Sequence, residues 1–176
     1  SPATRNARKI LENTGGVLNE HDGKRVLSVY GVQVTREKLV GNVEQAKMAA
    51  EEIGYPVVMK VMSVDIPHKT EAGVIKLGIR SETELVASFG QILENAKKFR
   101  AAVKIDGVLV QEMAEKGVEL IIGMKRDAGF GPVIMFGLGG IFVEVFKDVS
   151  FRIPPISFQD AREMIEEIKG SRLLQG

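Results

Sequence analysis

The segment Val57–Met62 is a nearly continuous apolar run that is interrupted by one charged residue, Lys60. A short run of this kind, opened by Pro56, is typical of a strand buried on both faces. A second segment, Gly73–Ile79, alternates apolar and polar residues and is a candidate partner strand. The chain is therefore predicted to fold around a sheet that has a lysine inside one of its strands.

Helices are expected between the strands, because residues that begin helices recur along the chain. Three capping boxes pair an Asn or Ser with an acidic residue or Gln three positions later. They are Asn42 with Gln45, Ser81 with Glu84, and Ser157 with Asp160. The helices that they predict cover 43–53, 82–99 and 158–168. From Gly107 onward the pattern becomes rich in strands, which are expected over 108–113, 118–124, 133–136 and 142–146. We therefore predict a mixed α/β (α+β) fold that divides near Asp106.

Composition excludes several classes of function. The 24 Lys and Arg balance 23 Asp and Glu, which leaves no excess of positive charge to bind a polyanion such as nucleic acid. The absence of cysteine excludes disulfides, thiolate nucleophiles and cysteine-based metal sites. There is no apolar run of about 18 residues and no signal-peptide pattern, so we expect a cytoplasmic protein without a membrane span.

The common catalytic motifs are absent. The sequence has no Walker-type phosphate loop, and Gly137–Gly140 lacks the strand-to-helix context of a dinucleotide fingerprint. His21 and His68 are the two histidines, which excludes a multi-histidine metal site and leaves little support for a Ser-His-Asp hydrolase. We interpret His21 as a solvated helix residue.

Lys60 and His68 are the first candidates for chemistry. The lysine stem can pass along apolar surface while its ammonium reaches a phosphate, although an edge-strand lysine that reaches water explains the pattern equally well. His68 lies in the polar segment Pro67–Gly73. Its neutral imidazole could attack phosphorus, but an exposed loop histidine without a task is the commoner case.

Glycines and carboxylates in the second half provide another set of candidates. Gly139 and Gly140 could let backbone amides approach an anion, with Glu144 and Asp148 holding magnesium beside it. A tight turn with solvated charges is the alternative, but Glu144 lies between two valines, where an unpaired carboxylate is costly.

A further group of residues lies at the end of the strand expected over 108–113 and just beyond it. Glu112 and Met113 end this strand and could offer an adenosine a carboxylate and backbone polar groups. Glu119 interrupts another apolar segment and has an equally good explanation as an ordinary surface carboxylate.

Four segments, taken together, resemble one family. They are Gly54–Lys60, Pro67–Gly73, Val110–Met113 and Phe130–Gly140. The chain resembles the ATP-grasp domain of the ADP-forming acyl-CoA synthetases, in particular the acetate-CoA ligase (ADP-forming) β subunit. The resemblance implies an ATP-grasp fold with two lobes, 1–106 and 107–176, and a nucleotide cleft between them. It also implies reversible conversion of acyl-CoA, ADP and phosphate to acid, CoA and ATP, with a CoA- and acyl-binding α subunit or α portion as partner in a hetero-oligomer.

The resemblance assigns a role to each candidate. His68 is implied to carry the phosphoryl group on a swinging loop, and Lys60 to neutralise the phosphates of ATP or ADP. Glu112 and Met113 are implied to form the adenine hinge, and Glu119 to contact the ribose. Gly139 and Gly140 are implied to line the phosphate path, and Glu144 and Asp148 to bind Mg²⁺.

One departure from the family and two alternative functions stay open. Family members continue into a strand with an acidic-x-Asn-Pro pattern that supplies magnesium ligands, and this sequence ends before it, so we expect a truncated second lobe. The alternatives are an ATP-grasp ligase that forms an acyl phosphate directly and a nucleotide-sensing lobe without chemistry. Neither of them requires a histidine at position 68.

Overall fold

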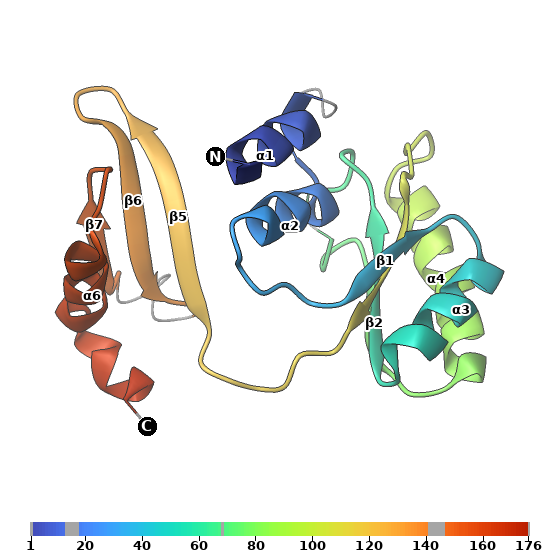
Figure 1. Ribbon diagram of the computed structural model, residues 1–176. Coiled ribbons are helices and arrows are strands. Elements are labelled where there is room, and N and C mark those ends of the chain that lie inside the picture. The colour runs from blue at the N-terminus through green and yellow to red at the C-terminus, as the bar shows by residue number, and fades with distance from the viewer. Residues whose placement is uncertain (1, 13–17, 68, 141–146, 176) are drawn as a thin grey trace. The chain divides into compact units, whose positions relative to one another are not determined.

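The computed structural model describes residues 2–12, 18–67, 69–140 and 147–175, and the chain divides into two compact units, Ser1–Ala114 and Glu115–Gly176. Each unit combines helices with a sheet of its own (Figure 1). The mixed α/β character predicted from the sequence is therefore confirmed. Among the helices of the described residues, none is both long enough and apolar enough to cross a bilayer.

The first unit is built on a four-stranded antiparallel sheet with the strand order β1-β4-β2-β3. Helices α3 and α4 lie on one side of this sheet and α2 lies on the other (Figure 1). The elements follow in the order α1 (Pro2–Glu12), α2 (Glu20–Val29), β1 (Glu37–Val40), α3 (Val43–Ile53), β2 (Val57–Met62), β3 (Ile75–Ile79), α4 (Glu82–Phe99) and β4 (Gly107–Glu112).

The register of the sheet decides which side chains face the helices. Val57, Met59 and Val61 of β2 are fully buried in the core formed with α3 and α4. Because side chains alternate along a strand, Lys60 points to the opposite face, where Leu109 of β4 is its cross-strand neighbour. That face is the one toward α2. Val58 and Met62 share it and are buried as well, so β2 is buried on both faces, as the sequence predicts, with its one charge on the α2 side.

The three predicted N-cap residues begin their helices, but one of the three predicted capping boxes is reciprocal, because the Gln45 and Glu84 side chains accept the amides of Gly41 and Arg80, one residue before the N-cap. Asn42 accepts a hydrogen bond from the Gln45 amide, and α3 ends at Gly54, whose positive φ of 91° a residue with a Cβ rarely adopts. Ser81 caps α4 in the same way. In α6 (Phe158–Glu167), Ser157 and Asp160 form a reciprocal capping box. The helices expected over 43–53 and 82–99 are therefore confirmed, and the last one ends one residue earlier than expected.

The second unit is a three-stranded antiparallel sheet with the order β5-β6-β7, covered on part of one face by α6. Its core joins Phe136 and Leu138 of β6 to Met164 and Ile168. The elements before and after α6 are β5 (Leu120–Asp127), β6 (Gly131–Leu138), β7 (Val149–Arg152) and the 3-10 helix η1 (Lys169–Leu174).

Two strand predictions for this unit differ from the structure or fall outside it. The strand expected over 118–124 begins at Leu120 and continues to Asp127, whose carboxylate accepts the Gly129 and Phe130 amides and so forms the turn to β6. The strand expected over 142–146 lies outside the described residues.

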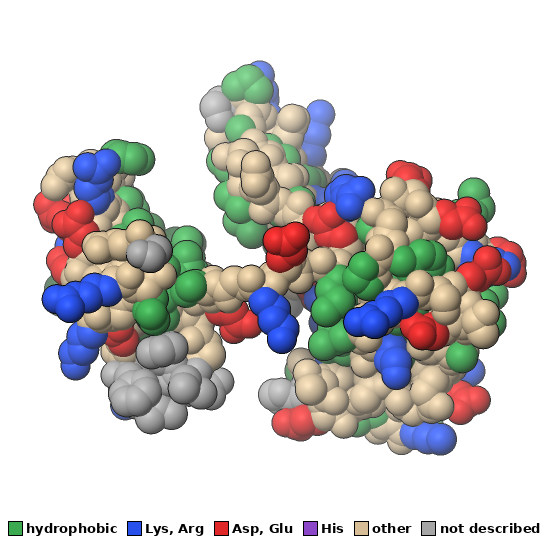
Figure 2. Space-filling view, turned by 90° about the horizontal axis from the view of Figure 1, so that it is seen from below, with side chains coloured by type: hydrophobic (Ala, Val, Ile, Leu, Met, Phe, Trp, Pro, Cys, Tyr) green, Lys and Arg blue, Asp and Glu red, His purple; other side chains and the backbone are tan. Residues whose placement is uncertain are grey.

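The boundary between the two units lies after Ala114 rather than near Asp106. The reason is β4, which belongs to the first unit because it forms hydrogen bonds with both β1 and β2. Figure 2 shows acidic and basic side chains interspersed over the visible face of this unit, as its nearly neutral composition leads one to expect.

Helix α4 provides a test of the core. Leu85 is completely buried against the sheet, and Leu85→Ala is expected to lower the free energy of unfolding by about 2–5 kcal/mol, because it leaves a cavity. The matched control is Val86→Ala on the exposed side of the same helix, where the side chain is 45% exposed. Urea denaturation measures both, and equal losses for the two variants would contradict the packing described above.

Candidate functional site

Lys60 lies in an interior strand of the sheet, because β2 is flanked by β4 and β3. The alternative of an edge-strand lysine that reaches water is therefore wrong. Its ammonium instead bonds to the Glu20 carboxylate of α2, with 2.9 Å between Nζ and Oε1, and its side chain is only 19% exposed. A half-buried cation is thus held at a defined point on the α2 face of the sheet.

Glu20 is shared between two lysines. Its Oε1 atom also accepts a hydrogen bond from Lys24 Nζ at 2.9 Å. Burial by itself raises the pKa of Glu20, but the hydrogen bonds and charges of Lys60 and Lys24 outweigh burial and lower that pKa from 4.5 to about 2. The carboxylate is therefore ionised at neutral pH and holds both ammonium groups.

The network continues to β1 through Glu37, whose side chain is 6% exposed. Lys24 Nζ donates to Glu37 Oε2 at 2.7 Å, and His21 Nδ1 lies 2.8 Å from Glu37 Oε1. The interpretation of His21 as a solvated residue is therefore wrong. This cluster was not predicted from the sequence, where its one signal is the spacing of Glu20 and Lys24 by four residues, which places both charges on the same side of a helix.

Glu112, a predicted hinge residue, is the last residue of β4, and Met113 follows it. The Glu112 carboxylate accepts hydrogen bonds from Arg36 Nε at 2.6 Å and from the Arg36 amide at 2.9 Å. These bonds, the side-chain one first, lower the pKa of Glu112. The Met113 amide donates to the Pro56 carbonyl at 3.4 Å, which fixes the backbone where β4 leaves the sheet.

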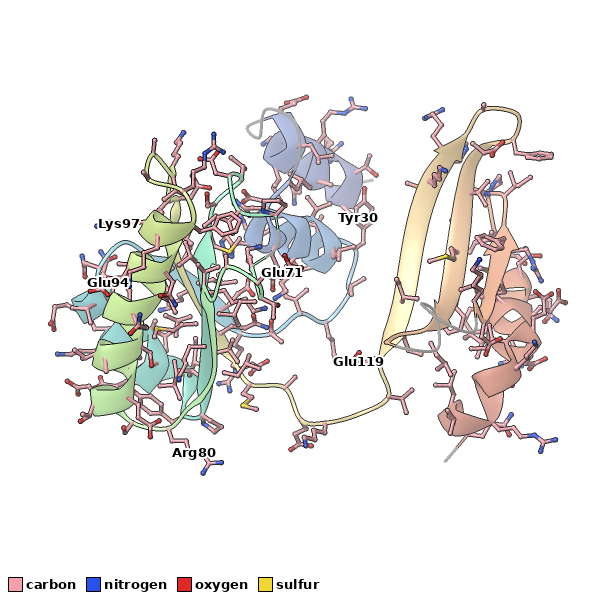
Figure 3. The ribbon with its side chains drawn as sticks, turned by 180° about the vertical axis from the view of Figure 1, so that it is seen from behind. Tyr30, Glu71, Arg80, Glu94, Lys97 and Glu119 are labelled. Carbon is pink, nitrogen blue, oxygen red and sulfur yellow. The ribbon has the colours of Figure 1, made fainter. Side chains whose placement is uncertain are left out.

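Glu119, Gly139 and Gly140 line one cavity of about 290 Å³ in the second unit. Glu119 lies at the start of β5 (Figure 3), and its carbonyl accepts the Gly139 amide at 2.7 Å. A Cβ at Gly139 would come within 2.9 Å of Glu119 Cβ, so this close approach requires glycine. The structure thus brings these three predicted residues together.

Asp148 is turned toward the backbone of η1. Its Oδ1 accepts the Lys169 amide and its Oδ2 accepts the Gly170 amide, each at 2.8 Å, and the residue is 8% exposed. Both oxygens that a magnesium ion would use are therefore engaged in holding the start of a helix. No group of three Asp, Glu or His side chains suited to a metal occurs among the residues that the structure describes.

Two predicted site residues, His68 and Glu144, lie outside the described residues. Of the others, Lys60, Glu112 and Met113 belong to the first unit. A cavity of about 830 Å³ in this unit is lined by residues of β1 and α3 with His21, and neither Lys60 nor Glu112 borders it. This cavity therefore contains none of the predicted site residues of the first unit that the structure describes.

Comparison with known proteins identifies the family. The ATP-grasp domain family matches residues 9–176. The beta subunit of acetate–CoA ligase (ADP-forming) II from Pyrococcus furiosus is 49% identical over 96% of this chain and 71% of that subunit. Acetate–CoA ligase (ADP-forming) I from Archaeoglobus fulgidus is also 49% identical over 96% of this chain, which spans 24% of that protein.

A solved structure agrees with this result. Acetyl-coenzyme A synthetase 1 from Ca. Korarchaeum cryptofilum, in complex with coenzyme A and Mg-AMPPCP, is 45% identical with a TM-score of 0.81, over 99% of this chain and 74% of that one. In that structure a phosphohistidine segment points towards the nucleotide binding site. The chain described here belongs to the ATP-grasp family, in the group that contains the beta subunits of ADP-forming acetate–CoA ligases. The family and fold implied by the resemblance are confirmed.

The ion pairs of Glu20 predict how stability depends on pH. A carboxyl group whose folded-state pKa is lowered stabilises the fold above its unfolded pKa, here 4.5, and loses that contribution as pH falls toward about 2. After solvent screening, we expect this contribution to be at most about 2 kcal/mol. Urea denaturation of wild type and Glu20→Gln should therefore show a difference that is constant above pH 6 and shrinks below pH 4.5. Exposed Glu94→Gln is the control, and a pH-independent difference for Glu20→Gln would contradict the ion pairs.

Asp148 yields a prediction that separates a structural from a metal-binding role. Asp148→Asn replaces one acceptor by a donor that faces a backbone amide, so we expect a loss of about 1–3 kcal/mol in the free energy of unfolding. The loss should be the same in excess chelator and in excess magnesium, and the exposed control Glu166→Gln should show none. A loss that appears only with magnesium would instead assign Asp148 to a metal site.

Proposed function

We propose that the chain is the nucleotide-binding, phosphoryl-relay part of an ADP-forming acyl-CoA synthetase. The overall reaction converts acyl-CoA, ADP and phosphate to a free acid, CoA and ATP, and it runs in both directions. The observation that carries the proposal is the segment Pro67–Ala72, with its single histidine, in a chain whose solved relative has a phosphohistidine segment that points towards the nucleotide. The cytoplasm, where ATP and acyl-CoA are both present, is the proposed compartment.

His68 is the proposed phosphoryl acceptor. A neutral imidazole nitrogen attacks the γ-phosphorus of ATP, an N–P bond forms, the bond from that phosphorus to the β,γ-bridging oxygen breaks, and ADP leaves. The reverse step returns the group to ADP. Phosphoryl transfer is accelerated mainly by alignment of the reacting groups and by neutralisation of the phosphate charge. The residues around the phosphates are therefore expected to contribute most of the rate acceleration.

Lys60 is proposed to supply the positive charge. Its ammonium is already held away from bulk water by Glu20, so a phosphate that binds there exchanges one anionic partner for another. The backbone at Glu112 and Met113 is proposed to receive the adenine, and the cavity of Glu119, Gly139 and Gly140 to receive ribose and phosphate oxygens.

Magnesium, when bound, would neutralise charge on the phosphate oxygens. The described residues do not fit a site for it, because both Asp148 oxygens accept backbone amides and no other acidic cluster is present among those residues. Glu144 lies outside them. Among the described residues, Lys60 and backbone amides are the groups proposed to neutralise charge on the phosphates.

A partner is part of the proposal. The Pyrococcus furiosus relative is named as a beta subunit, and the Archaeoglobus fulgidus relative is a much longer protein. We propose that an α subunit, or an α portion of a longer chain, binds CoA and the acyl group and exchanges the phosphoryl group with His68.

The relay is tested by incubating the purified protein with magnesium and ATP at mildly basic pH and measuring its intact mass. We expect the gain of one phosphoryl group, located by mass spectrometry in the tryptic peptide from Val61 to Lys69. His68→Ala should abolish the gain, and His21→Ala, which removes the other histidine, should leave it intact. Lys60→Met should slow the gain by a factor of roughly 100 without removing the acceptor.

The alternatives predict different outcomes. A direct acyl-phosphate ligase would turn over with a carboxylic acid without phosphorylation of His68, and a sensing lobe would bind ATP without any transfer. Either result would contradict the relay.

A further inference from the structure

The segment that joins β2 to β3 is held at its N-terminal end by Asp65. The Asp65 carboxylate accepts hydrogen bonds from Arg100 Nη1 at 2.8 Å and from the Lys104 amide at 2.9 Å, both just beyond the end of α4. Ser63 Oγ donates to the Lys104 carbonyl at 2.7 Å. Ile66, the next residue, is 1% exposed within the core. The chain is therefore fixed up to position 66.

The same segment is held at its C-terminal end by Asn95 of α4. Asn95 Nδ2 donates to the Gly73 carbonyl at 2.8 Å, and Gln91 Nε2, one turn earlier, donates to Asn95 Oδ1 at 3.0 Å. The bond from Gln91 determines which end of the Asn95 amide faces Gly73. Gly73 has a φ of 62°, and a Cβ there would come within 3.1 Å of Asn95 Nδ2, so the contact also uses the glycine.

Backbone bonds and burial complete this end. The Gly73 amide donates to the Thr70 carbonyl at 3.1 Å, and the Val74 amide donates to the Lys69 carbonyl at 3.2 Å. Ala72 is 9% exposed and Val74 is fully buried in the core. Glu71, by contrast, is exposed in this segment (Figure 3). Among the described residues, the contacts of this segment with the core thus stop at Ile66 and resume at Ala72.

These two ends limit where residue 68 can be presented. An extended chain covers at most about 3.5 Å per residue, so the positions of the two ends set the range that a residue between them can reach. Transfer to or from phosphorus requires the reacting atoms to approach to about 3–3.5 Å. A small displacement of either end therefore changes whether the histidine meets its partner.

From this geometry we propose that Asn95 is a positioning residue for the relay, which it serves by fixing Gly73 and with it the C-terminal end of the His68 segment. The inference rests on the proposed function of His68. Asn95 lies on a helix that packs Leu85, Phe89 and Ile92 into the core, so the segment is attached to an element of the core of the first unit. A hydrogen bond between partly exposed groups adds little to global stability, which allows the two roles to be separated by experiment.

Asn95→Asp is the most informative variant, because it keeps the size of the side chain and its acceptor for Gln91 but removes the donor to Gly73. Asn95→Ala removes both. Glu94→Gln, which changes the neighbouring exposed residue of the same helix, is the control (Figure 3). Hydrogen exchange at the Gly73 and Val74 amides reports on the segment, and single-turnover phosphorylation of His68 by ATP reports on the relay.

We expect both Asn95 variants to lose roughly tenfold in exchange protection at Gly73 and Val74 and about 10- to 100-fold in phosphorylation rate. ATP affinity, the melting temperature and exchange in the remainder of α4 should stay close to wild type, as should every property of Glu94→Gln. Faster exchange with an unchanged phosphorylation rate would overturn the positioning role, and so would unchanged exchange. A wild-type protein that ATP never phosphorylates would instead contradict the proposed function, and the exchange data would still decide whether Asn95 holds Gly73.

Discussion

The first unit depends on the insertion of β4 between β1 and β2. This strand is the last element of the unit in sequence, yet its hydrogen bonds create the centre of the sheet. Its register sends Val108 and Val110 into the core with α3 and α4, while Leu109 and Gln111 face α2. The same register places Lys60 on the α2 face and brings Glu112 to the end of the sheet beside Arg36.

Local features of the fold could be predicted from the sequence, and long-range ones could not. The caps at Asn42, Ser81 and Ser157 act on amides only three residues away, so their patterns determine helix starts without reference to the rest of the chain. The pairing of β4 with β1 joins residues far apart in sequence, and no local pattern encodes it. For this reason the sequence-based division fell at Asp106, before a strand that belongs to the first unit.

The candidate site shows the same distinction. Lys60 was recognisable because a charge inside an apolar strand is rare, whereas its partner Glu20 belongs to a helix 40 residues earlier. Asp148 matched a magnesium ligand by residue type and family position, but the structure engages both its oxygens with the amides of η1. Residue type indicates which ligands a side chain can bind, but only the structure shows which hydrogen bonds that side chain already makes.

Helix α4 makes two sets of contacts, and different residues of the helix are responsible for each. Leu85, Phe89 and Ile92 anchor its inner face in the core, while Asn95 contacts Gly73 and Arg100, just beyond the helix, contacts Asp65, at the two ends of the segment that joins β2 to β3. The position of this one helix therefore affects both the packing of the sheet and the placement of the segment that joins β2 to β3. In the proposed relay, a substitution that shifts α4 by a fraction of an ångström would leave a folded protein in which the histidine and its phosphoryl partner no longer meet, so a variant can lose the relay without any change near the proposed chemistry.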